Sequence, residues 1–344
     1  MLKLTRKTCP ARRYYCFDGV NEVESQMPAP HSVIHLQARQ ERNTKDTTTM
    51  WVQKLIWSDG FWAFLLLLPT ILGLILTYGS VTGGFIVSLT EWDILTPPKW
   101  VGLKNYVTAF LHDDLFRKSM VNTLYYTFGV VPLGTLLSLF AAVTMNQGIK
   151  GQTLFRTVYF LPTVTSGIAV ALLWVWLYNY QYGLINYFLT VLGLPKISWL
   201  GDPRFAMPAI IIMSIWRGLG YNMILFLAGL QSIPQEYYEA ARIDGASRWQ
   251  TFYHVTVPLI SPTTFFIVVL SLIGSFQVFE ATYVMTQGGP FYSTYTIVLL
   301  IFFQAFQWFH MGYASAIAYV LFAIILLLTL IQMRLERYWV HYMA

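Results

Sequence analysis

The sequence predicts an all-α polytopic membrane protein with six transmembrane helices. Of its 344 residues, 56% are hydrophobic and only 11% are charged, whereas ordinary soluble domains carry about 25% charged residues. The mean hydropathy is +0.52, and the apolar residues gather in six stretches. Because a helix needs about 20 apolar residues to cross the roughly 30 Å of a bilayer core, each stretch is long enough to span a membrane.

The six predicted spans cover residues 61–90, 121–145, 155–178, 205–230, 263–285 and 297–333. Four of them contain a proline within the span or near its start: Pro69, Pro132, Pro162 and Pro208. Proline removes a backbone donor and kinks a helix, and neighbouring helices can satisfy the carbonyls that it frees. We therefore expect a bundle of kinked helices.

The flanking segments are polar. Residues 1–55 are aperiodic and are expected to form a disordered tail. No apolar run precedes residue 61, so we expect no secretory signal peptide, and Met50 is a candidate for the true start. Cys9 and Cys16 match no common zinc pattern, so no metal site is expected. Residues 56–335 then form the membrane domain, and residues 336–344 form a short cytoplasmic tail.

The positive charge indicates orientation rather than nucleic-acid binding. Nine of the 22 Lys and Arg residues precede residue 55, and no basic helix with interleaved aromatic residues follows. With six spans, both termini lie on one side. If that side is the cytoplasm, its segments hold 15 Lys and Arg against six outside, which the positive-inside rule favours. A start at Met50 reduces this to seven against six, which decides nothing.

The segment between the fourth and fifth spans is polar but carries signals of ordered structure. Ser232 and Gln235 have capping-box spacing, as do Ser247 and Gln250. Gly245 lies between them, where a helix C-terminus favours a residue that tolerates positive φ. The pattern predicts a helix, a glycine hinge and a second helix.

Two prolines, Pro258 and Pro262, are expected to end the second helix of this segment. Tyr237, Tyr238 and Trp249 are aromatic residues of the kind that dominate protein interfaces. An interfacial helix lying on lipid would favour a more basic face. The segment is therefore interpreted as a cytoplasmic docking loop for a soluble partner.

The loop also has a recognisable motif. It contains Glu239, Ala240 and Ala241, then Gly245 after three residues, and Val255, Thr256, Val257 and Pro258 after nine more. This spacing resembles the EAA loop of the permease subunits of binding-protein-dependent ABC importers. The family pattern has isoleucine and leucine where this chain has Val255 and Val257, and both changes keep apolar bulk.

Further strings resemble the sugar-transporting branch of that family, of the maltose and glycerol 3-phosphate type. They are residues 101–106, 160–162, 183–186, 238–246 and 285–290. Each is weak alone, but together they occur in the expected order on six spans and extend the resemblance over roughly residues 58–335.

The resemblance implies the partners and the location. They are a second homologous permease, a dimeric ATP-binding subunit that holds ATP and magnesium, an extracytoplasmic solute-binding protein and a sugar, in the inner or plasma membrane of a bacterial cell. It also implies that the ATPase-coupling residues are Glu239, Ala240, Ala241, Asp244, Gly245 and Pro258. This chain has no G-x-x-x-x-G-K-[ST] motif and no catalytic constellation, so it is expected to be neither an enzyme nor a cofactor carrier.

Ionisable and polar residues within the spans are candidates for the solute pathway, because such groups face cavities or partners. Glu280 lies in the fifth predicted span, and Gln277 and Tyr283 are expected on the same helical face. Alternatively, Glu280 lies near the outer mouth and pairs with a basic group. Arg217 and Asn222 in the fourth span are further candidates.

Two alternatives to a sugar importer remain at this point. The same machine could carry glycerol 3-phosphate or a polyol, although a phosphate favours a cationic pathway and only Arg217 lies within a span. A stand-alone secondary transporter would show internal repeats and ionisable relays, and the sequence shows neither.

Overall fold

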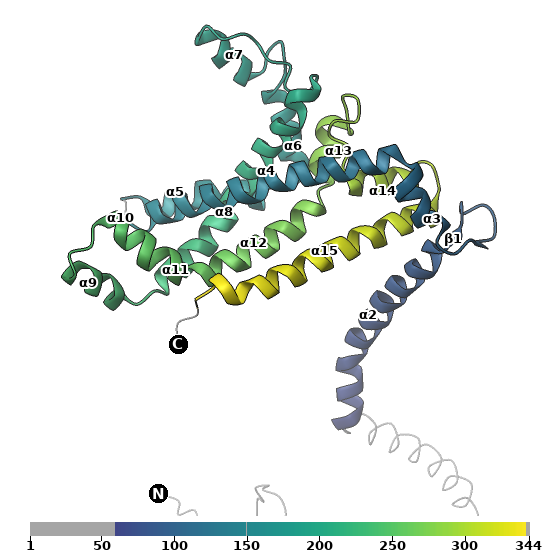
Figure 1. Cartoon of the computed structure of the whole chain (residues 1–344), viewed down its shortest axis with the longest axis horizontal. Helices are drawn as coiled ribbons and strands as arrows, with labels where there is room; N and C mark the ends of the chain where they lie inside the picture. The colour runs from purple at the N-terminus through teal and green to yellow at the C-terminus, as the bar shows by residue number, and fades with distance from the viewer. Residues whose placement is uncertain (1–58, 149, 342–344) are drawn as a thin grey trace, which may run out of the picture. The chain divides into compact units, whose positions relative to one another are not determined.

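The computed structural model describes residues 59–148 and 150–341. The helices in chain order are α2 (Asp59–Ser88), α3 (Lys104–Val107), α4 (Asp114–Met145), α5 (Gln152–Val164), α6 (Gly167–Leu177), α7 (Leu184–Val191), α8 (Pro203–Gln231), α9 (Gln235–Ile243), α10 (Arg248–Thr251), α11 (Val257–Leu259), α12 (Ser261–Phe276), α13 (Glu280–Thr286), α14 (Ile297–Phe306) and α15 (Met311–Trp339) (Figure 1). Two π-helical segments, η1 (Thr108–His112) and η2 (Phe252–Thr256), complete the helical part. The predictions for residues 1–55, including Met50 and both cysteines, lie outside the described residues.

The only sheet in the described part is a two-stranded antiparallel ribbon of β1 (Thr90–Glu91) and β2 (Lys99–Trp100). Thr90 faces Trp100 and Glu91 faces Lys99. The residues from Leu76 onward form one compact unit, and the part of α2 up to Ile75 belongs to a separate one. The all-α prediction is therefore confirmed.

Helices α2, α4, α8 and α15 are each long and apolar enough to cross a membrane. Two bent pairs pass the same test together: α5 with α6, which meet at 100°, and the helical path Arg248–Leu259 with α12, which meet at 63°. The described residues thus hold four to six candidate spans. Each of the six predicted stretches overlaps one of these helices or bent pairs.

Three predicted spans are wrong as continuous helices, and the third of the six is divided into α5 and α6. The fifth stretch is broken after Phe276, and a short helix restarts at Glu280. The sixth is divided into α14 and α15, because the chain turns at Phe309, which has a φ of 58°. His310 fixes this turn, since its backbone N–H donates to the Gln304 carbonyl and its ring nitrogen contacts the Gln304 side chain at 2.9 Å.

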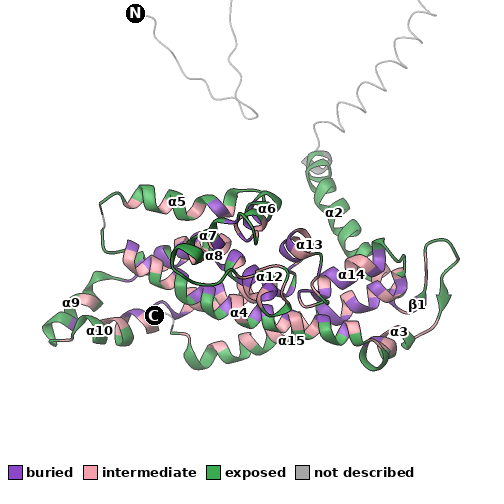
Figure 2. Ribbon diagram, turned by 90° about the horizontal axis from the view of Figure 1, so that it is seen from above, coloured by how far each residue is buried: buried purple, intermediate pink, exposed green. Residues whose placement is uncertain are grey.

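The centre of the unit is the packed pair α4 and α8, and buried residues concentrate on these helices (Figure 2). Small residues permit close helix contact in membrane proteins. At Gly220 of α8, a side chain would meet the backbone carbonyl of Tyr159 on α5. Helix α5 therefore crosses α8 at a separation that only glycine allows.

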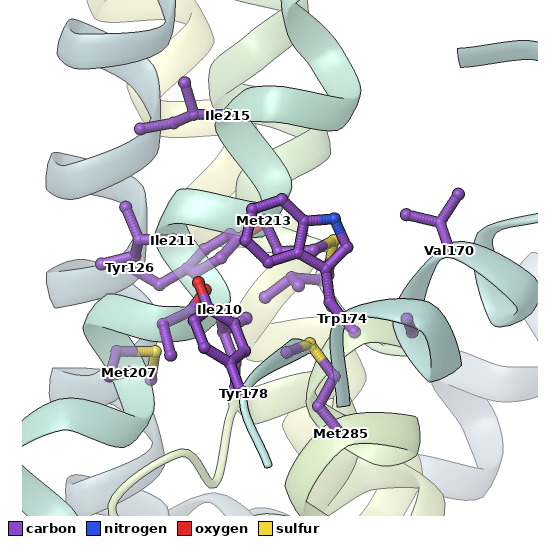
Figure 3. Packing of buried hydrophobic residues seen from close by; sticks show 14 residues of the cluster. Tyr126, Val170, Trp174, Tyr178, Met207, Ile210, Ile211, Met213, Ile215 and Met285 are labelled. Carbon is purple, nitrogen blue, oxygen red and sulfur yellow. The ribbon is translucent and has the colours of Figure 1, made fainter. Parts of the chain in front are cut away.

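A large apolar cluster joins α4, α6, α8 and α13. Figure 3 shows the ring of Trp174 beside Met213 of α8, with Tyr178 and Met285 close by. The Tyr178 hydroxyl donates to the Ala209 carbonyl of α8 at 3.0 Å. This cluster fixes α6, which follows the 100° bend, against α8.

The segment α9–α11 and the C-terminal end of α15 lie at the same end of the bundle (Figure 1). The His341 backbone N–H donates to the Ser261 hydroxyl at the start of α12, at 2.8 Å. Helix α3 and strand β1 lie at the opposite end (Figure 1).

Candidate functional site

The polar loop after α8 forms the predicted helix, hinge and helix. Helix α9 ends in a Schellman motif: the Gly245 N–H donates to the Arg242 carbonyl at 3.1 Å, and the Ala246 N–H donates to the Ala241 carbonyl at 2.9 Å. Gly245 has a φ of 73°, which a β-branched residue adopts only with strain. The hinge predicted at Gly245 is therefore confirmed.

The two predicted capping boxes have different outcomes. Ser247 and Gln250 form the reciprocal pair of hydrogen bonds at the start of α10. The box predicted for Ser232 and Gln235 is wrong. Ser232 instead ends α8 and donates its hydroxyl to the Gly229 carbonyl at 2.8 Å, and α9 begins after Pro234 without a side-chain cap.

The second helix extends slightly further than predicted. Pro258 lies inside α11, and the helix ends at Leu259, before Pro262 of α12. The π-helical segment η2 ends two residues before this proline, and a proline offers no N–H to continue a regular ladder. The path then bends by 63° into α12.

The loop presents both polar and apolar groups. Glu239, Ala240 and Asp244 are exposed, whereas Ala241 is buried. Ile243 and Trp249 are 86% and 79% exposed, respectively. Further apolar residues of the loop are also exposed. Exposed apolar groups gathered in this way mark interaction surfaces.

A second candidate site is an ion pair between α8 and α13. Arg217 Nη1 of α8 lies 3.0 Å from Glu280 Oε2, and the side chains are 34% and 38% exposed. Arg217 lies about halfway along α8, and Glu280 is the first residue of α13. Glu280 thus pairs with a basic group, as expected if it is not free to face the pathway alone. That basic group, Arg217, belongs to this chain.

The other predicted pathway residues do not gather around this pair as expected. Gln277 is exposed and lies in the break after α12, so it does not share a helical face with Glu280 and Tyr283, and that prediction is wrong. The Tyr283 ring packs on Phe279, with ring centroids 5.2 Å apart. Asn222 is five residues beyond Arg217, or about 140° around α8.

Gly167 is the site residue that the sequence did not reveal. A Cβ atom there would overlap with the Glu280 carboxylate and the Arg217 guanidinium. Gly167 begins α6, directly after the 100° bend. In addition, the Thr163 hydroxyl donates to the Arg217 carbonyl at 2.9 Å. The cluster of Thr, Ser and Gly at 163–167 was the available signal for a break.

The ion pair therefore lies where the third and fifth apolar stretches are both interrupted. Irregular backbone at membrane depth is tolerated only where it is buried in protein or lines a water-filled cavity. The described residues contain no group of three His, Cys, Asp or Glu side chains that could hold a metal ion.

Comparison with known proteins agrees with this architecture. Residues 134–340 match the family model described as "Binding-protein-dependent transport system inner membrane component". The probable ABC transporter permease protein YesP of Bacillus subtilis is 38% identical, with 83% of this chain and 93% of YesP covered. The trehalose/maltose transport system permease protein MalF of Thermococcus litoralis is 35% identical, with coverage of 83% and 97%.

Among solved structures, a chain of a bacterial alginate ABC transporter is similar. That crystal structure is a complex with an alginate pentasaccharide-bound periplasmic protein. The TM-score is 0.71 at 25% identity, and the match covers 85% of this chain and 96% of that chain. The present chain belongs to the family of binding-protein-dependent transport system inner membrane components, and it is a multi-pass ABC transporter permease.

Proposed function

We propose that this permease is the non-catalytic membrane subunit of an ATP-driven sugar importer, with both termini in the cytoplasm of a bacterial cell. It pairs with a second, homologous permease. A dimeric ATPase binds its loop, and an extracytoplasmic protein delivers the solute. The trehalose/maltose and alginate transporters that it resembles support a saccharide. Membership of this family excludes a stand-alone secondary transporter and gives no support to glycerol 3-phosphate or a polyol over a sugar.

The observation that carries the proposal is the connection between the loop and the ion pair. Helix α8 enters the loop and holds Arg217 about 21 Å before its own end. Helix α12 leaves the loop, is about 24 Å long, and ends just before Glu280. A displacement of the loop by the ATPase therefore acts on both partners of the ion pair through one helix each.

The groups around the pair suit a saccharide. Arg217 donates hydrogen bonds and Glu280 accepts them, and both side chains are partly exposed. Gln277, which is exposed and lies three residues before Glu280 in the chain, can do both. We place the solute contacts at these three residues. Tyr283 and Asn222 lie outside this cluster and would contact solute elsewhere along the pathway.

Gly245 offers the test of coupling. No atom lies within 4 Å of a Cβ built there, so a substitution acts through the backbone alone. Gly245→Val places a β-branched residue at positive φ, at a cost of about 1–3 kcal/mol. Gly245→Asn is the matched control, because asparagine tolerates this conformation.

In a reconstituted importer, Gly245→Val should lower sugar uptake per ATP hydrolysed several-fold, and Gly245→Asn should stay near wild type. Normal coupling in the valine variant would refute the role of the loop. A thermal-shift screen of the cognate binding protein against saccharides would identify the sugar.

A further inference from the structure

A hollow of about 960 Å³ lies between the loop and the ends of α4 and α8. Tyr238, Thr251 and Thr256 contribute hydroxyl groups to its lining, and six further side chains carry an amide or a guanidinium group: Asn146, Gln147, Gln231, Gln235, Arg242 and Arg248. These six come from four different segments of the chain, so a ligand in the hollow would join the loop to the two central helices.

Charge is segregated between this hollow and the rest of the loop. Both arginines line it, whereas the loop carboxylates of Glu236, Glu239 and Asp244 do not. Among the ion pairs formed by residues 59–148 and 150–341, none includes Arg242 or Arg248. The hollow therefore has two positive charges and no negative side chain in its lining.

The dipole of its own helix favours only one of these arginines. Arg242 lies in the last turn of α9, where a cation is favourable. Arg248 is the first residue of α10, and a positive charge is unfavourable at a helix N-terminus. The C-termini of α4 and α8 also reach the hollow and favour a cation there, and an anionic ligand in the hollow would contact both guanidinium groups.

The lining specifies the class of ligand. The guanidinium fork of arginine binds phosphate through two parallel hydrogen bonds. The side-chain amides of Asn146, Gln147 and Gln231 both donate and accept, as hydroxyl groups require. Helices α4 and α8 end at this hollow, and their last carbonyls are acceptors for hydroxyl donors.

We propose that this hollow binds a phosphate-bearing polyol. Sugar phosphates and the phosphopolyol headgroups of lipids share this chemistry. The bound ligand joins the ends of α4 and α8 to α9 and α10, so it stabilises the present position of the loop and opposes its movement. This regulatory consequence rests on the proposed coupling function, whereas the binding itself does not.

The test uses the full chain in nanodiscs of phosphatidylcholine, without the ATPase, so that a failure of coupling cannot affect the result. Calorimetry would compare glucose 6-phosphate with glucose. Glucose 6-phosphate should bind at least about tenfold more tightly than glucose, and only its binding should depend on the two arginines. Arg242→Gln and Arg248→Gln should each weaken binding about tenfold or more, as expected for a charged hydrogen bond. Lys150→Gln is the matched control, because Lys150 is exposed nearby but does not line the hollow.

A second arm separates the two sources of ligand. In nanodiscs that contain phosphatidylinositol, native mass spectrometry should show lipid retained by the wild type and lost from both glutamine variants if the headgroup occupies the hollow. Lysine variants at both positions keep the charge but lose the fork, so they should bind with intermediate affinity. The proposal is overturned if the wild type binds neither glucose 6-phosphate nor lipid, or if the glutamine variants bind as well as Lys150→Gln.

Discussion

The ion pair between Arg217 and Glu280 can be tested by reversing its charges. At a charge separation of about 4 Å and an effective dielectric constant of about 20, the attraction is about 4 kcal/mol. About a third of each side chain is exposed, so solvent screens the pair. We expect a coupling free energy of about 1–2 kcal/mol, between the values typical of exposed and buried pairs.

The measurement is a double-mutant cycle on thermal unfolding in nanodiscs, using Arg217→Gln, Glu280→Gln and the double variant. The exchange variant Arg217→Glu/Glu280→Arg should recover most of the lost stability, because it restores opposite charges. It should not recover sugar uptake in the reconstituted importer, because donors and acceptors are then presented from the wrong helices. Recovery of both stability and uptake would show that the pair is only structural, and a coupling near zero would refute the ion pair itself.

Two further predictions concern packing. Gly220→Ala should lower the free energy of unfolding by about 2–3 kcal/mol, because its Cβ meets backbone atoms of α5. The control Gly218→Ala, on the same helix with no atom nearby, should be neutral or slightly stabilising. Equal melting temperatures of the two variants would refute the close crossing of α5 and α8. Asn186→Ala should make residues 180–200 more sensitive to limited proteolysis. The buried Asn186 side chain accepts from the Ile197 N–H at 3.1 Å and donates to the Ile197 carbonyl at 2.9 Å, and each of these groups left unpaired costs about 1–3 kcal/mol. Unchanged cleavage would contradict a role of Asn186 in ordering this segment.

Features that depend on local hydrogen bonds were predictable from the sequence. The Gly245 helix end and the Ser247 capping box form their hydrogen bonds within a few residues, so they do not depend on how distant helices pack. Ser232 has the same spacing to Gln235 but a different role, because α8 extends to Gln231 and uses Ser232 at its C-terminus. A serine between two helices can serve either one, and the sequence does not show where the first helix ends.

The ion pair was only half predictable. Arg217 and Glu280 were recognisable as charges in apolar stretches, but their pairing depends on how α8 and α13 pack. The expected face shared by Gln277, Glu280 and Tyr283 assumed an unbroken helix. Hydropathy does not reveal a break within an apolar run, and it could not place Gly167 against two charged side chains from other helices.

Under the proposed coupling, the distribution of breaks predicts which elements move. Within the described residues, α4, α8 and α15 run without interruption, whereas the third and fifth stretches are bent or broken. Bending a continuous helix disrupts backbone hydrogen bonds, which is costly in lipid, and a break that already exists avoids this cost. Arg217 lies on the continuous α8 and Glu280 lies directly after a break. A movement that begins at the loop is therefore expected to shift Glu280 relative to Arg217, so that the ion pair opens while the α4–α8 core stays intact.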